Sequence, residues 1–516
     1  MSKRTSLSTS ARVLRPSALA TAVATACLLG AAPSWAFSSG STGADGALNP
    51  AVNTEIQLPA SGILNYTSIN IPAGVTVKFK RNALNTPVHL LVQGNSTIAG
   101  IIDVTGGDAK QSGTYGDGNL GDDGIAGAGG PGGFDGGRGG RDDAQSRPDV
   151  IIGGSGLGPG GGKGGNTRAN GCYGGIYYHY IGRSGAFGAK GSSAYGNGYN
   201  CTADANDFGV AQPYGAPALT ALIGGSGGGG GNGGVNFSGS GGGGGGGAIL
   251  IATSGVMSIT GQINATGGDG GNAAGTGQGQ PGAGGSGGAI RLIATTLSGN
   301  GGIYANGGCL NSSNVRRQNC SVYEYGGSVG RIRVEGDSVT FAGTAQPAYS
   351  ADTPAPVFVS NAPTLRIASI AGTNVPANPT GNADVALPAS LVNPVVINFE
   401  TTNIPPGNTV KLRVVPAYGD YVEALSPAIT GSNASGNTSV SVSLPQGPST
   451  LQAITSYTVT VAMGESLSRF AQNERVEKVE IIAGLGKADS TARLITVSGK
   501  SFDVPISILQ MVGFNG

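Results

Sequence analysis

Hydrophobic and polar positions alternate in several stretches of the chain that also resemble one another. Val88–Gly107 (VHLLVQGNSTIAGIIDVTGG) aligns without gaps on Ile249–Gly268 (ILIATSGVMSITGQINATGG), and Ile290–Gly308 is a third copy, one residue shorter. A divergent copy, GRIRVEGDSVTFAG, begins at Gly330. Alternation with a period of two is typical of a strand that buries one face. The pattern therefore predicts an all-β fold built on a repeated strand unit.

When the copies are superimposed, apolar residues fall on apolar residues. The aligned sets are Val88, Ile249 and Ile290; Leu90, Ile251 and Leu292; Ile102, Ile263 and Ile303; and Val104, Ala265 and Ala305. Such columns are what successive coils of a parallel β-helix place above one another. We therefore expect the copies to lie side by side in space. Residues 69–80 (INIPAGVTVKFK) would form an earlier coil or a cap.

Glycine-rich arms separate the copies. The chain holds 98 glycines in 516 residues, well above the usual share of about 7%. From Gly118 to Gly139 a glycine recurs at every third position, which matches the left-handed extended helix with three residues per turn. Almost no proline fills the other two positions, which argues against collagen. The register favours an ordered, polyglycine-II-like bundle over flexible linkers, the alternative that such a composition also allows.

The pattern changes from about residue 351 onward. Alternating runs lie at 394–400, 408–416, 438–445 and 454–462, with turn signals such as IPPG and GSNASGN between them. Short strands at this spacing predict an antiparallel, immunoglobulin-like β-sandwich over residues 351–462. Residues 463–516 are expected to form a small C-terminal β region with a short helix, because GESLSRFAQNERVEKV, from Gly464, has a helical composition.

Residues 1–36 have the layout of a secretory signal peptide. A basic start is followed by the apolar run Ala18–Ala32 and by small residues at Ser34 and Ala36. The expected mature chain is 37–516, with a glycine-rich β-helix over 37–350. Removing the four basic residues of the leader from 29 leaves 25 against 28 acidic ones, a net charge of −3, which argues against nucleic acid as a partner. Because no second apolar stretch approaches membrane-spanning length, we expect a secreted, extracellular or surface-associated protein with no transmembrane segment.

Four cysteines remain in the expected mature chain: Cys172, Cys201, Cys309 and Cys320. An even number of cysteines in an exported chain indicates two disulfides. Pairing of nearest neighbours would join Cys172 to Cys201 and Cys309 to Cys320. Three connectivities are formally possible, and the sequence does not choose among them.

Residues able to carry catalysis are few and scattered. Of the two histidines, His89 falls on an outward position of its repeat and is expected on the surface, and His179 lacks the partners of a zinc site or a catalytic triad. Asp103 aligns with Asn264 and Tyr304, so the repeat builds no ladder of carboxylates for glycoside chemistry. Acids in or beside the first arm are interpreted as solvated rather than as calcium ligands: Asp108, Asp117, Asp122, Asp123 and Asp135. We expect no enzyme activity and no cofactor.

The strongest functional signal is the insertion at residues 166–222. It places six tyrosines within one candidate disulfide loop: Tyr173, Tyr177, Tyr178, Tyr180, Tyr195 and Tyr199. Tyrosine offers a large contact area and a polar tip at low entropic cost, so it recurs in binding surfaces. The alternative is that these rings pack over the glycine arms, which offer few side chains of their own.

The gapped repeats resemble right-handed parallel β-helix proteins. The arms, such as GDDGIAGAGGPGGFDGGRGG and GGSGGGGGNGG, resemble the polyglycine-helix bundles of phage receptor-binding adhesins and of glycine-rich receptor ectodomains. The resemblance covers roughly residues 60–345 and implies that loops at the tips of the bundle perform recognition.

We therefore expect a bacterial cell-surface or extracellular-matrix protein with a structural or adhesive role. Its partners would be a surface glycan or further copies of itself. A carbohydrate-active enzyme on a β-helix is the first alternative, and it would need a cleft with paired acids. An ice- or mineral-binding protein is the second, and it would need a regular Thr or Asp array; the sequence displays neither feature.

Overall fold

The computed structural model describes the chain from residue 37 onward, with gaps. The described residues are 37–110, 124–142, 151–165, 182–192, 210–219, 221–234, 237–272, 279–309, 326–358, 362–380, 383–459, 467, 470–472, 474–483, 490–504, 506 and 509. From Ser38 on they belong to one compact unit. Their named elements are all strands, so the protein is almost entirely β, with both parallel and antiparallel sheets.

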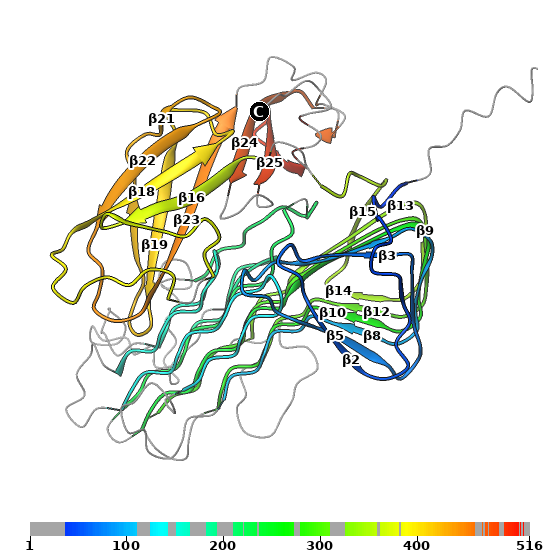
Figure 1. Ribbon diagram of the computed structural model, residues 1–516, viewed down its shortest axis with the longest axis horizontal. Coiled ribbons are helices and arrows are strands. Elements are labelled where there is room, and N and C mark those ends of the chain that lie inside the picture. The colour runs from blue at the N-terminus through cyan, green and yellow to red at the C-terminus, as the bar shows by residue number, and fades with distance from the viewer. Residues whose placement is uncertain are drawn as a thin grey trace, which may run out of the picture. The chain divides into compact units, whose positions relative to one another are not determined.

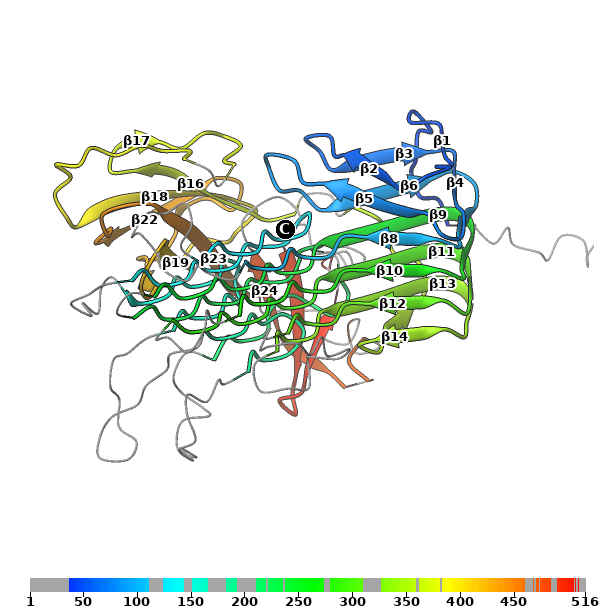
Figure 2. The ribbon, with the colours of Figure 1, turned by 90° about the horizontal axis from the view of Figure 1, so that it is seen from below.

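The N-terminal part holds two parallel sheets (Figure 1). In spatial order, the first contains β1 (Ala47–Leu48), β4 (Ser68–Ile71), β7 (Ser96–Ile98), β9 (Ala248–Ile259), β11 (Ala289–Gly299), β13 (Arg331–Phe341) and β15 (Ser350–Asp352), with β3 (Ile63–Tyr66) and β6 (Val88–Val92) continuing it beside the first half of β9. The second contains β2 (Thr54–Gln57), β5 (Thr76–Lys80), β8 (Ile101–Asp103), β10 (Gln262–Asn264), β12 (Gly302–Tyr304) and β14 (Thr344–Gln346). Figure 2 shows the second sheet as a regular stack from β5 to β14.

Strand pairing confirms the columns expected from the repeats. Ile249 pairs with Val88 on one side and with Ile290 on the other. Ile263 likewise lies between Ile102 and Ile303. These inward residues of both sheets form one buried core, because each strand turns alternate side chains toward the facing sheet. Residues 69–80 supply β4 and β5, so they form an earlier tier of the stack, as expected.

Extended arms leave the stack between its strands and return to it (Figure 1). We call the described arm residues the glycine bundle: 105–110, 124–142, 151–165, 182–192, 224–234, 237–247, 265–272, 279–288, 305–309 and 326–330. The bundle therefore begins where β8, β10 and β12 end and feeds back into β9, β11 and β13.

The C-terminal part holds two antiparallel sheets. One contains β17 (Thr373–Asn374), β16 (Thr364–Ile370), β18 (Val395–Thr402), β22 (Gly436–Val442) and β21 (Thr430–Gly431). The other contains β20 (Val422–Leu425), β19 (Thr409–Pro416), β23 (Ser449–Val459), β24 (Val476–Ala483), β25 (Ser490–Thr496) and β26 (Ser501–Val504). Phe399 of the first sheet and Leu412 of the second belong to one buried cluster, so the two sheets share a core.

The region after residue 463 differs from the expectation in two ways. Its strands β24–β26 extend the sheet of β19 and β23, so this region shares a sheet with the region before it. In addition, the last residues of the stretch expected to be helical belong to β24, which begins at Val476. Val476 and Val479 are buried, and their burial against the shared core overrides the helical composition of the stretch.

Candidate functional site at the distal end of the glycine bundle

The central arm of the bundle, residues 224–234, hydrogen-bonds in a repeat of three. The N–H groups of Gly227 and Gly230 donate to the carbonyls of Leu157 and Gly154, at 3.0 and 2.9 Å. The N–H groups of Gly228 and Gly231 instead reach the arm at 237–247, through Gly243 and Ser240 at 2.9 and 2.8 Å. Gly229 donates to a third arm, at the carbonyl of Arg183, over 2.8 Å. Neighbours that recur every third residue indicate a helix with three residues per turn.

The carbonyls of the central arm accept hydrogen bonds from three further directions. Gly228 accepts from Gly137 at 2.8 Å, Gly230 from Gly165 at 2.7 Å, and Gly229 from Ala283 at 2.9 Å. The six neighbouring segments are thus 134–140, 151–157, 160–165, 182–186, 238–246 and 280–287. Because both groups of each peptide are paired, the arm carries its backbone through the interior without an unsatisfied donor or acceptor in residues 227–231.

Close packing explains why glycine is required in the interior of the bundle. A Cβ added to Gly229 would lie 1.9 Å from the carbonyl oxygen of Lys163, and one added to Gly230 would lie 1.9 Å from that of Arg138. No side chain fits at such distances. Arm 124–142 has fewer neighbours, so non-glycine residues such as Ala128 alternate with its glycines and point outward, where Ala128 is exposed.

The arms end together, away from the parallel sheets (Figure 2). Gly233 donates to Ile151 at 2.7 Å, Lys110 to Ile125 at 3.1 Å, and Gly270 to Cys309 at 2.8 Å. Each of these residues lies near one end of the described part of its arm. We call this the distal end of the bundle. It holds side by side the points at which residues 111–123, 143–150, 166–181, 273–278 and 310–325 join the described chain.

The candidate tyrosines lie outside the described residues, between anchors that the structure does describe. Four of them fall within 166–181 and two within 193–209: Tyr173, Tyr177, Tyr178, Tyr180, Tyr195 and Tyr199. Gly165 hydrogen-bonds to Gly230 at 2.7 Å, and the Cα of Gly182 faces the carbonyl of Gly229. Both ends of segment 166–181 are thus fixed against the central arm. The role of the tyrosines stays a prediction.

The second tyrosine segment also has paired anchors. The N–H of Ser192 donates to the Oγ of Ser184 at 2.6 Å, and the N–H of Gly191 donates to the carbonyl of Ala211 at 2.9 Å. The described residues on the two sides of segment 193–209 therefore lie close together.

The two disulfides also stay predictions. Cys172, Cys201 and Cys320 lie outside the described residues. The N–H of Cys309 donates to the carboxylate of Asp269 at 2.7 Å, and the N–H of Asp269 donates to the carboxylate of Asp108 at 2.8 Å. These three residues occupy the same place after the GG of each repeat, so each carboxylate fixes the backbone of the next copy.

Acids of the first arm have structural partners, which the sequence alone did not indicate. Besides Asp108, Asp135 accepts a hydrogen bond from the N–H of Gly129 at 2.8 Å and forms an ion pair with Arg81. Asp135 thereby joins the two ends of the turn at residues 129–135 and links this turn to Arg81, which follows β5. Asp117, Asp122 and Asp123 lie outside the described residues. Within the described ranges, no three His, Cys, Asp or Glu side chains come together as a metal site would require.

The expectation that His89 lies on the surface was wrong. Its side chain does point away from the core between the parallel sheets, as the alternation predicted, but the residue is only 8% exposed. Its ring lies 5.5 Å from that of Phe358, which comes from the segment following β15. A local pattern could not show that a distant segment covers this face.

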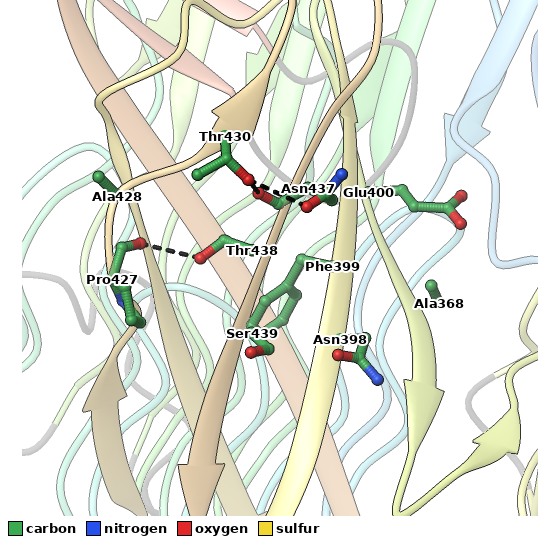
Figure 3. A pocket seen from close by; sticks show the side chains of 10 residues that line it. All are labelled: Ala368, Asn398, Phe399, Glu400, Pro427, Ala428, Thr430, Asn437, Thr438 and Ser439. Atoms are coloured by element: carbon green, nitrogen blue, oxygen red, sulfur yellow. Dashed lines mark hydrogen bonds between the residues drawn. The ribbon is translucent and has the colours of Figure 1, made fainter.

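A shallow groove of about 460 Å³ lies on the outer face of β16, β18 and β22 (Figure 3). Amide and hydroxyl side chains make up half of its lining residues: Ala368, Asn398, Phe399, Glu400, Pro427, Ala428, Thr430, Asn437, Thr438 and Ser439. Several of these already bond within the protein, since Thr438 donates to the carbonyl of Pro427 at 2.9 Å and Asn398 donates to Ser369 at 2.8 Å. The groove carries no pair of free carboxylates suited to acid–base chemistry, because Glu400 pairs with Arg366 at 2.8 Å.

Comparison of the chain with protein-family models, with curated proteins and with solved structures finds no match. Among the described residues, no helix has the length and apolar character needed to cross a bilayer.

Proposed function

We propose that this protein is a secreted structural or adhesive component of the bacterial surface or extracellular matrix. In this proposal its parallel sheets form a β-helix, its arms form a polyglycine-II-like bundle, and its C-terminal antiparallel sheets form an immunoglobulin-like module. The tips of the bundle, above all the tyrosine-rich insertion, contact a surface glycan or another cell.

The observation that carries the proposal is the six-neighbour packing of residues 224–234. It supports a rigid scaffold, because positions such as Gly229 leave no room for a larger residue unless the surrounding backbone shifts. A rigid base fixes both anchors of a recognition loop and lowers the entropy lost when the loop binds. Loops on a rigid scaffold are also where binding residues most often occur.

The proposal is tested on the expected mature chain, residues 37–516, produced in an oxidising compartment. Binding to whole cells and to a glycan array is compared for the wild type, for a variant with all six tyrosines changed to phenylalanine, and for one with all six changed to alanine. We expect the alanine variant to lose binding at least tenfold, and the phenylalanine variant to retain part of it, because its rings still supply contact area.

Electron microscopy of the same preparations separates the two forms of the proposal. Filaments or sheets would indicate a matrix component, and discrete monomers that bind cells would indicate an adhesin. Wild-type chains that neither bind nor assemble, or that release shortened sugars from the array, would contradict the proposal.

A further inference from the structure

Part of the outward face of the first parallel sheet is buried, although it points away from the core. His89, Leu250, Arg291 and Arg333 form one outward column across β6, β9, β11 and β13. Leu250 and Arg291 are each 1% exposed, and His89 and Arg333 are each 8% exposed. Two guanidinium groups and an imidazole are thus withdrawn from water on this face.

Glu335 holds the two arginines together. Arg291 donates to both oxygens of the Glu335 carboxylate, at 2.9 and 3.1 Å, and Arg333 donates to one of them at 3.3 Å. The side chains of Arg291 and Glu335 are each 1% exposed. A buried carboxylate can be retained at this site because paired guanidinium donors offset its desolvation.

The same cluster binds the segment that follows the parallel sheets. We call residues 352–358 the strap. The N–H of Ala355 donates to Glu335 at 2.9 Å, Arg291 donates to the carbonyl of Pro356 at 3.3 Å, and Asp352 pairs with Arg333 at 2.9 Å. Phe358 then lies over the ring of His89, with ring centroids 5.5 Å apart. The strap therefore crosses the face from the ion cluster to the histidine.

His89 is placed so that a positive charge on it would be unfavourable. Its Nδ1 is buried without a hydrogen-bond partner. The paired residues on the adjacent strands β3 and β9 are Ile63 and Leu250, and the strap covers it with Phe358. The charged group that acts on it is Arg291 of β11, while the carboxylates of Glu335 and Asp352 are already paired with arginines.

Burial is the main cause that lowers the pKa of His89 to about 4. Arg291 lowers the pKa further, and the backbone of Pro87 opposes both effects. These directions agree with the geometry, because an uncompensated charge beneath the strap would have to be desolvated beside a cation.

From this interface we propose that the strap is an acid-released latch: protonation of His89 breaks the cover formed by Phe358 and frees residues 352–358 from Arg291 and Glu335. In the open latch the imidazole is hydrated and regains an ordinary affinity for protons. Acid therefore favours the open form, because that form binds one more proton than the closed form.

The pH range in which the strap is released is set by the pKa of His89 in the closed form and in the open form. Above about pH 6.5 the ring is neutral in both forms, and the latch stays closed. Between about pH 6.5 and about pH 4 only the open form takes up the proton, so the ratio of closed to open latch falls by a factor on the order of 100. Below about pH 4 this histidine causes no further loss.

Hydrogen exchange of the Ala355 amide in the mature chain tests the latch, with the amide of Gly228 in the glycine bundle as an internal control. After correction for the intrinsic rate, we expect protection of Ala355 to fall on the order of 100-fold between pH 7.5 and pH 4, while Gly228 stays protected. In His89→Gln, which keeps a polar side chain but does not titrate in this range, protection of Ala355 should change less than threefold. An equal fall in wild type and variant, or no fall in wild type, would overturn the proposal.

A second measurement keeps the test decisive if His89→Gln does not fold. The imidazole of His89 is titrated by NMR in the wild-type chain, with His179→Asn identifying the remaining signal. We expect the midpoint of the titration to lie below pH 6.5, within the range over which Ala355 loses protection. Protonation near pH 6.5 with the Ala355 amide still protected would refute the latch.

Discussion

The N–H of Gly229 donates a hydrogen bond to the carbonyl oxygen of Arg183 at 2.8 Å, while its own carbonyl accepts from Ala283 at 2.9 Å. Segments far apart in the sequence thus meet at one residue. Because glycine loses more conformational entropy on ordering than any other residue, such an arm is stable only when neighbours satisfy it on every side. The packing around residues 224–234 meets this requirement.

Gly229→Ala should destabilise the protein by about 2–4 kcal/mol, because the new methyl group overlaps a backbone carbonyl and disrupts a hydrogen bond. Denaturant unfolding of the mature chain measures this change. Ala128→Ser adds one heavy atom at an exposed site of the same bundle and should change stability by less than about 0.5 kcal/mol. Equal stability of Gly229→Ala and wild type would mean that the arm is not packed as described.

Glu335→Ala should cost about 3–5 kcal/mol, because it leaves the buried guanidinium of Arg291 without its carboxylate. The exposed pair of Arg366 and Glu400, whose side chains are 45% and 56% exposed, serves as the comparison. Glu400→Ala should cost less than about 1 kcal/mol, because solvent screens an exposed pair. Thermal unfolding of both variants checks the contrast, and similar losses would argue against the buried cluster.

Stability should fall with acid in a window set by His89. Its pKa is lowered to about 4 in the folded chain, against about 6.5 in an unfolded one. The unfolded chain therefore binds more protons between these values. Up to about 3 kcal/mol of stability, fully present above pH 6.5, should be lost as the pH falls to about 4. Denaturant midpoints measured across this range should show a shallower dependence in His89→Gln, and parallel curves would contradict the assignment to this residue.

Peptide mapping without reduction should recover Cys309 joined to Cys320 and Cys172 joined to Cys201. The backbone of Cys309 is fixed by Asp269 at the distal end, so a bond there would fasten segment 310–325 to the bundle. A crossed pairing, such as Cys201 with Cys309, would join the tyrosine-rich insertion to a different arm and would contradict the nearest-neighbour prediction.

The stacking of the repeats could be predicted because the apolar residues that align in the sequence are also the residues that pair in the sheet. Val88, Ile249 and Ile290 align in the sequence, and they pair in the sheet. The strands of the C-terminal part were also predictable from their alternation, as in β18 and β19. Alternation shows which face of a strand is buried. It therefore identifies strands that pair with strands of similar sequence.

The rest depends on contacts that no local pattern encodes. His89 is buried because the strap, which follows β15, covers it, and Val476 joins a strand because β23 lies beside β24. The three-residue register predicted arms with three residues per turn, and the hydrogen bonds of residues 227–231 recur with that period. The register did not predict that residues 224–234 would meet six neighbours. The candidate tyrosines remain a prediction from composition, supported by the fixed anchors at Gly165 and Gly182.

Amide hydrogen exchange of residues 227–231 in the mature chain measures whether the arms are an ordered scaffold. If the bundle is packed as described, these amides should be protected nearly as strongly as those of β9 and β11, because opening them requires the surrounding arms to separate. Exchange within about tenfold of the rate of an unstructured glycine chain would show instead that the arms are flexible linkers and that the recognition loops have no rigid base.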